Sequence, residues 1–186
     1  MEYIKTKYVT IIIVFSNPAT NILHLGLQSG QQVADLGAGG GAYTEAAAKL
    51  VAPAGKVFAV ELQRLLVSKL EAHLRDKHIT NVQVVWGDIE TSRGTRLRDV
   101  SVDAVIIANT LFQCKDTVGV IREAKRILKP GGKMLIIDWK DSFNNMGPDP
   151  KHILSPETLQ DILRAEGLVA ASCDVGDHHY GFIINV

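Results

Sequence analysis

Five acidic or amide side chains in this sequence each lie at or near the end of a short apolar run. They are Asp35, Glu61, Asp88, Asn109 and Asp138. If the runs are parallel strands, these side chains gather at the carboxyl ends of the strands, where ligands bind in open α/β sheets. The pattern therefore predicts a ligand-binding cleft along one rim of a sheet.

A glycine cluster follows the first of these residues. The stretch that holds Gly37, Gly39 and Gly41 fits the spacing G-x-G-x-x-G/A, with Gly37 and Gly39 in the first two fixed positions and Ala42 in the last. Glycine lets the backbone turn sharply and approach a ligand closely. On its own the spacing is weak evidence, since a tight strand-to-helix turn without a ligand would look the same.

The acids on either side of the glycine cluster bear on the kind of ligand. Glu61 follows Gly41 by about 20 residues, the spacing at which a carboxylate reaches an adenosine ribose. NAD and S-adenosylmethionine both carry that ribose. Asp35, two residues before Gly37, would repel a pyrophosphate but attract a sulfonium or an ammonium. The sequence therefore favours S-adenosylmethionine.

Four stretches together resemble the motifs of class I, Rossmann-like S-adenosylmethionine-dependent methyltransferases. Residues 33–41 resemble the first motif, 57–61 the acidic end of the second strand, 87–89 the adenine-contacting turn and 128–133 the turn after a helix. The likeness covers about residues 17–186. It is closest to the small-molecule group that includes quinone-biosynthesis and arsenite methyltransferase-like enzymes.

The resemblance implies roles around the methionine part of the cofactor. Gly37, Gly39 and Gly41 would line it, and Asp35 would face its ammonium. Asn109 would lie near the methionine and the transferred methyl group.

The resemblance also implies an adenosine subsite. Glu61 would bind the ribose hydroxyls, and Leu62 would pack on the adenine. Asp88 would accept a hydrogen bond from the adenine amino group, and the backbone of Ile89 would contact the ring.

Methyl transfer from a sulfonium depends mainly on positioning, because the leaving group is already activated. A general base would help if the acceptor is a hydroxyl or an ammonium group. Asp138 and His179 are the catalytic candidates near the rim. Each could instead be a packing or surface residue.

Strands and helices alternate along the chain, which predicts an α/β, three-layer sandwich. Its mostly parallel seven-stranded Rossmann-like sheet would end in an antiparallel C-terminal edge strand. We expect strands at 32–36, 57–60, 82–86, 102–108, 133–137, 168–173 and 180–185, and helices at 19–25, 42–51, 62–78, 117–128 and 155–166.

Length and composition predict one domain, residues 1–186, with a core at 17–186 and an N-terminal strand or docking segment at 1–16. The 20 basic and 20 acidic side chains balance, so charge offers no support for a nucleic-acid partner. The apolar run 8–15 is too short to span a membrane. Two cysteines without metal-ligand spacing suit the reducing cytoplasm, and no metal is expected.

The expected function is methyl transfer to an unidentified, small-molecule acceptor, with a homodimer as one way to complete an open pocket. Methylation of a macromolecule stays open as a variant of this hypothesis. Two other classes are weighed against it: a non-catalytic adenosyl-binding or interaction module, and an NAD-dependent oxidoreductase. The oxidoreductase is disfavoured by Asp35, which would repel a pyrophosphate.

Overall fold

The computed structural model describes residues 16–143 and 147–186. The N-terminal strand or docking segment expected at 1–16 therefore lies outside the described residues, apart from Ser16. Within the described ranges, no helix has the length and apolar character that a membrane crossing requires.

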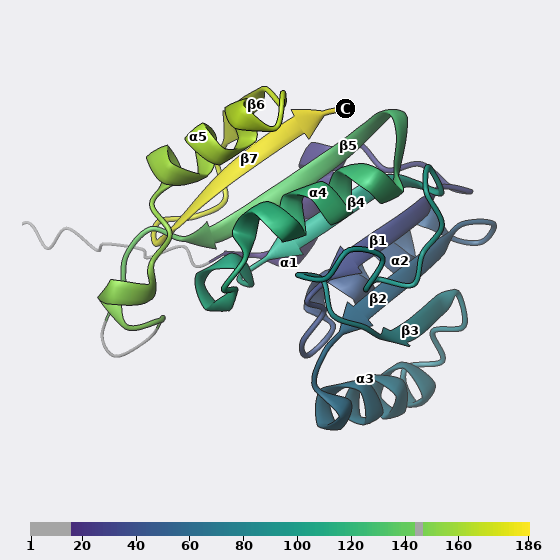
Figure 1. The fold of residues 1–186 in the computed structure, drawn as a ribbon. Coiled ribbons are helices and arrows are strands. Elements are labelled where there is room, and N and C mark those ends of the chain that lie inside the picture. Colours follow the sequence, from purple (N-terminus) through teal and green to yellow (C-terminus); the bar gives the residue numbers. More distant parts are fainter. Residues whose placement is uncertain (1–15, 144–146) are drawn as a thin grey trace, which may run out of the picture.

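The chain forms a seven-stranded sheet in the order β3-β2-β1-β4-β5-β7-β6 (Figure 1). Neighbours among β1 to β5 run parallel, while β7 pairs antiparallel with both β5 and β6. The strands are β1 (Gln32–Leu36), β2 (Lys56–Glu61), β3 (Val82–Trp86), β4 (Val102–Ala108), β5 (Leu128–Trp139), β6 (Ala170–Cys173) and β7 (His179–Asn185).

Helices cover both faces of the sheet, as the alternation of elements predicts. In Figure 1, α4 and α5 lie on one face and α2 on the other. The helices are α1 (Pro18–Asn21), α2 (Ala42–Val51), α3 (Arg64–Asp76), α4 (Thr117–Ile127) and α5 (Pro156–Ala165), with short 3-10 turns η1 (Ile22–Leu25), η2 (Leu111–Gln113) and η3 (Pro150–His152). The predicted three-layer α/β class is confirmed.

The central strand β4 shows why the inner strands lack polar alternation. Val105 and Ile107 pack in the core under α4 and α5, whereas Ala104 and Ile106 pack in the core under η1 and α2. Both faces are buried, so every position from Ala104 to Ala108 is apolar. Burial on both faces also determines where the strand ends, and the candidate site lies at these carboxyl ends of the strands.

The antiparallel strand of the C-terminal pair lies one place inside the sheet edge. The predicted antiparallel C-terminal edge of the sheet is confirmed, and within it β7 inserts between β5 and β6. Most of β7 is buried, whereas Ala171 and Ser172 of β6 are exposed. The more apolar strand takes the interior position because burial of apolar surface is favourable.

The turn predicted at 129–132 belongs to β5 in the structure. The register between β4 and β5 shifts there, since Val102 pairs with Leu128 but Ala104 pairs with Lys133. The backbone N–H of Gly131 donates to the carbonyl of Val186 at 2.6 Å, and the Val186 N–H donates to Gly132 at 3.0 Å. These bonds hold the turn against the end of β7 and keep it within the sheet.

Gly41 tests how tightly the glycine turn fixes the fold. It precedes α2 with φ at 87°, and a Cβ there would lie 2.3 Å from Cδ1 of Leu70. We expect Gly41→Ala to lower the free energy of unfolding by about 2 kcal/mol or more, through backbone strain and overpacking. Urea denaturation measures this change.

Gly40→Ala is the matched control, because a Cβ on Gly40 would meet nothing within 4 Å. We expect it to change stability by less than about 1 kcal/mol. Equal effects of the two substitutions would contradict the steric explanation.

Candidate functional site

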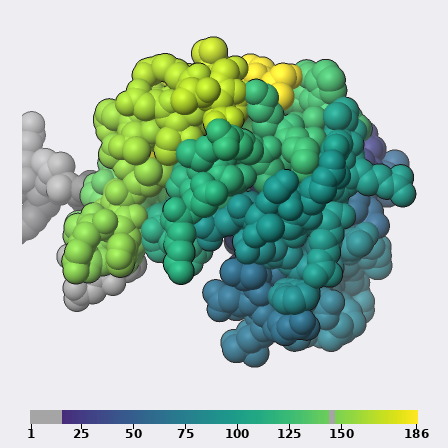
Figure 2. All heavy atoms as spheres, viewed as in Figure 1, coloured from purple at the N-terminus to yellow at the C-terminus, as the bar shows by residue number. Residues whose placement is uncertain are grey.

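Two adjoining cavities form a cleft at the carboxyl ends of β1 to β4. Their volumes are about 910 and 540 Å³, and both are lined by Gly37, Glu61, Gln63 and Gln113. Figure 2 shows the surface notched between the green residues that follow β4 and the blue residues of α3. The cleft lies at the rim where ligands bind in open α/β sheets.

The cleft is acidic. Asp35 and Glu61 line the larger cavity, while Glu61, Asp88 and Glu90 line the smaller one. Among the described residues that line either cavity, none is Lys, Arg or His. Such a cleft attracts cations and opposes phosphate groups.

Asp35 lies at the end of β1 and is only 2% exposed. Its carboxylate accepts a hydrogen bond from the Thr44 hydroxyl of α2 at 2.5 Å. Burial raises the pKa of Asp35 to about 6, against the opposing effect of Thr44, and the nearby Glu61 charge raises it further. Burying the ionised Asp35 carboxylate therefore costs free energy, and a cationic ligand nearby would offset this cost.

Glu61 is fixed by two backbone donors. Its Oε2 accepts from the Gly39 N–H at 3.0 Å, and its Oε1 accepts from the Gln63 N–H at 2.8 Å. A carboxylate offers about four acceptor positions, so room is left for two hydroxyl donors. This arrangement suits a vicinal diol such as a ribose.

The glycine turn leaves open space above the strand end. Gly37 donates to the Val60 carbonyl at 2.9 Å, and a Cβ on Gly37 would lie 2.5 Å from Cγ2 of Thr110. At Gly39 the nearest atom to such a Cβ is 3.9 Å away. Glycine is needed at 37 for packing, whereas at Gly39 the backbone is left accessible to a ligand.

The predicted adenine contacts lie together in the smaller cavity. Leu62 is exposed over its mouth, and Ile89 is buried in its wall. The two carboxylate oxygens of Asp88 accept from the Glu90 N–H at 3.0 Å and from the Thr91 hydroxyl at 3.1 Å. Asp88 thus shapes its own turn and keeps acceptor capacity towards the cleft.

Asn109 lies in the larger cavity in a strained conformation. Its φ is 53°, which is uncommon for a residue other than glycine. Its buried Oδ1 has no hydrogen-bond partner among the described residues. An unpaired buried oxygen and a strained backbone both indicate a functional position.

Asp138 is buried behind the cleft and does not line it. Its Oδ2 accepts from the Phe112 N–H of η2 at 3.0 Å, and its Oδ1 accepts from the Trp139 N–H at 2.8 Å. Burial raises its pKa to about 6. The observed contacts make Asp138 a support for η2, and the structure does not bring it to the predicted substrate side.

His179 begins β7 and likewise lies outside the cleft lining. Its ring packs on Trp139 with centroids 4.2 Å apart, and burial lowers its pKa to about 4. Neither ring nitrogen has a partner among the described residues. The neighbouring His178 bonds to Asp141 at 2.5 Å.

Several lining residues were not predicted from the sequence. Gln63, Thr110 and Gln113 line the cleft, and Thr44 supports Asp35 from behind. Their residue types carry no distinctive chemistry, and only their closeness to Glu61 and Asn109 in the sequence could have suggested them. Over residues 16–143 and 147–186, His, Cys, Asp and Glu side chains form no group of three that could hold a metal.

Comparison with known proteins agrees with this geometry. The model of a methyltransferase-domain family matches residues 27–170. A solved SAM-dependent methyltransferase from Aquifex aeolicus is 27% identical with a TM-score of 0.84, covering 92% of this chain and 90% of that one.

Two curated relatives match about two thirds of the chain or slightly less. An arsenite methyltransferase of Aquipseudomonas alcaligenes is 35% identical over 117 residues, which are 60% of this chain and 34% of the relative. A ubiquinone/menaquinone biosynthesis C-methyltransferase of Pseudomonas aeruginosa is 30% identical over 122 residues, which are 65% of this chain and 46% of the relative. The chain thus spans between a third and a half of the length of these relatives.

The buried Asp35 carboxylate predicts a stability that depends on pH. Because its pKa rises from 3.8 to about 6 on folding, its contribution is present below pH 3.8 and is lost as the pH rises through 6. We expect Asp35→Asn to stabilise the protein at pH 8 by about 2 kcal/mol, and by much less at pH 4.5. Urea unfolding at both pH values measures the difference.

Asp76→Asn, at an exposed position near the end of α3, is the control and should change stability little at either pH. A variant at Asp35 that is less stable than the wild type at pH 8 would show that the carboxylate is not costly.

Proposed function

The chain belongs to the family of methyltransferase domains, and on this basis we propose that it transfers the methyl group of S-adenosylmethionine to a small-molecule acceptor. The acidic cleft carries the proposal, because a cationic adenosyl ligand matches Asp35 and Glu61 whereas a dinucleotide would bring its pyrophosphate next to them. An NAD-dependent reaction is disfavoured by the same charges.

The residues present fit the proposed cofactor. The turn at Gly37 and Gly39 approaches the cleft as backbone alone, and the Asn109 oxygen is buried without a described partner. The cofactor would supply an activated methyl group on a positive sulfur. Asp35 and Asn109 would accept hydrogen bonds from its amino group, and Glu61 would accept them from its ribose.

The chain's own contribution is to bind, orient and exclude water. Glu61 and Asp35 are already held by hydrogen bonds, so little rearrangement is needed on binding. Asp138 acts in this proposal by holding η2, which carries Gln113 into the cleft wall. No proton transfer is assigned to Asp138 or His179, since neither lines the cleft.

A small-molecule acceptor is supported by the overall charge balance and by the relatives. The 20 basic and 20 acidic residues give no general attraction to nucleic acid. The arsenite and quinone-biosynthesis methyltransferases are small-molecule enzymes by name. A homodimer that completes an open pocket stays part of the hypothesis.

Calorimetry tests the cofactor. We expect S-adenosylmethionine and S-adenosylhomocysteine to bind with a Kd of about micromolar order, and NAD not to bind. Glu61→Ala should weaken S-adenosylhomocysteine binding about tenfold or more, because hydrogen bonds to a charged group are lost. Glu71→Ala, on the exposed side of α3, is the control.

Tight binding of NAD, or unchanged affinity in Glu61→Ala, would contradict the assignment of the cleft to the adenosyl cofactor.

Transfer of a labelled methyl group from S-adenosylmethionine tests the reaction. The purified protein is incubated with cell extract divided into small-molecule, RNA and protein fractions. We expect label to enter the small-molecule fraction and Glu61→Ala to abolish most of it. Label in RNA or protein instead would overturn the acceptor class, and no label in any fraction would favour a non-catalytic adenosyl-binding module.

A further inference from the structure

The connection 87–101 between β3 and β4 forms one wall of the cleft without a helix. It lies beside α4 on the sheet, and its Ile89 and Leu97 pack against the same hydrophobic core as α4. Its turn at Asp88, Ile89 and Glu90 lines the smaller cavity. The opposite wall is the segment after β4, which carries Thr110 and Gln113.

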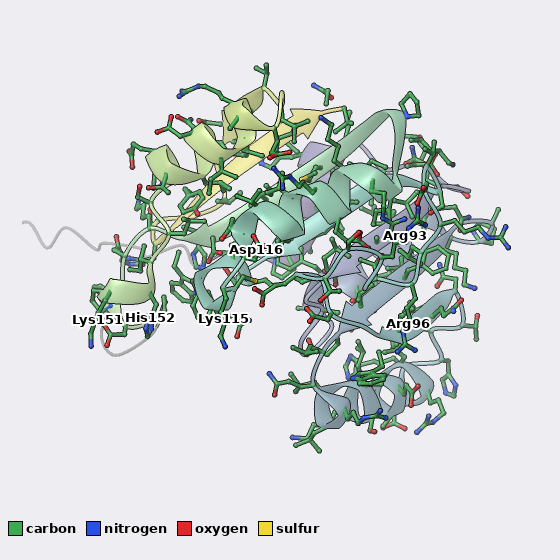
Figure 3. The ribbon with its side chains drawn as sticks, viewed as in Figure 1. Arg93, Arg96, Lys115, Asp116, Lys151 and His152 are labelled. Carbon is green, nitrogen blue, oxygen red and sulfur yellow. The ribbon has the colours of Figure 1, made fainter. Side chains whose placement is uncertain are left out.

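One side chain joins these two walls. Oε2 of Glu90 accepts hydrogen bonds from the Lys115 N–H at 2.7 Å and from the Asp116 N–H at 2.6 Å. Both donors lie directly before α4, and Figure 3 shows Lys115 and Asp116 together at this end of the helix. Hydrogen bonds between a carboxylate and backbone N–H groups are about twice as strong as neutral ones.

The backbone of Glu90 is held at the same place. A Cβ on Gly119, in the first turn of α4, would lie 2.7 Å from the Glu90 carbonyl oxygen. The N–H of Gly119 donates to the Asp116 side chain at 2.8 Å, which caps the helix. The absence of a side chain at Gly119 therefore lets the connection and the capped helix pack directly against each other.

The same connection has a second attachment away from the cleft. Glu123 of α4 accepts from the Arg93 N–H at 2.9 Å and from the Thr95 hydroxyl at 2.6 Å. Burial opposes its ionisation, but hydrogen bonds from Arg126, Thr95 and the backbone hold the pKa of Glu123 at about 2. Glu123 thus anchors the connection away from the cleft. Glu90, in contrast, lines the cleft.

We propose that Glu90 is a positioning residue that fixes the two walls of the cleft relative to each other. Through it, the adenine-side turn at Asp88 and Ile89 sets the position of the segment that carries Asn109, Thr110 and Gln113. The residues proposed to bind the adenosine and those proposed to lie near the transferred methyl group then keep a fixed position relative to each other. The binding part of this inference rests on the proposed function, but the contact itself does not.

Substitution of Glu90 tests the role by two measurements on the full chain. Calorimetry gives the affinity for S-adenosylhomocysteine, and amide hydrogen exchange gives the protection of residues 109–116. We expect Glu90→Ala to weaken binding about tenfold and to speed exchange at Lys115 and Asp116, because two charge-assisted hydrogen bonds are lost.

Glu90→Gln separates positioning from charge. Its amide oxygen can still accept from both N–H groups, so we expect binding within about threefold of the wild type and near-normal protection. If the negative charge in the cleft were what matters, Glu90→Gln would be as weak as Glu90→Ala, and the proposal would be overturned.

Asp99→Ala is the control on the same connection. Asp99 bonds to Arg93 and Arg126 and does not line the cleft. We expect its affinity and its exchange over 109–116 to match the wild type. Equal weakening by Asp99→Ala would show a general loss of structure and would refute a specific role.

The outcomes also separate this inference from the proposed function. Failure of the wild type to bind S-adenosylhomocysteine would remove the proposed function, while exchange at Lys115 and Asp116 would still report on the Glu90 contact. Normal binding with unchanged affinity and exchange in Glu90→Ala would remove the inference alone.

Discussion

Uncompensated negative charge at the carboxyl end of β1 and β2 is the constraint on which the rest of the site depends. Asp35 is buried, its pKa is raised to about 6, and Glu61 adds a second charge to the same cavity. No Lys, Arg or His among the described lining residues balances them. The folded chain therefore bears an electrostatic cost at neutral pH that a bound cation would relieve, a common compromise between stability and function.

The fold concentrates this charge without relying on long side chains. Parallel pairing of β1 with β2 and of β1 with β4 brings Asp35, Glu61 and Asn109 to one edge of the sheet. Gly39 then leaves the space above the strand end open, since a Cβ there would meet no atom closer than 3.9 Å. The register of the sheet thus brings the hydrogen-bond acceptors together, and the glycine turn leaves space above them for a ligand.

The sequence predicted most strands closely because both faces of the inner strands are buried. Strands β1, β3 and β4 have the expected ends, and Asp35, Glu61 and Asn109 all line the cleft. Three features escaped prediction. The order of β6 and β7 depends on their relative burial, a comparison between distant segments that no local pattern contains.

The other two features concern side-chain direction and unremarkable residue types. Asp138 and His179 lie at the expected strand ends, yet Asp138 turns towards the backbone of η2 and His179 packs on Trp139. Position along a strand does not determine which groups a side chain meets. Gln63 and Gln113 were missed because their type is common on any surface, and only the folded turn places them in the cleft.

The polar attachment of the connection 87–101 has a kinetic consequence. Of its apolar side chains only Ile89 and Leu97 pack on the core and Val100 is exposed, so hydrogen bonds supply much of the free energy that holds it in place. Segments held in this way open locally while the rest of the protein stays folded. Opening of this connection would then proceed at a rate independent of global unfolding.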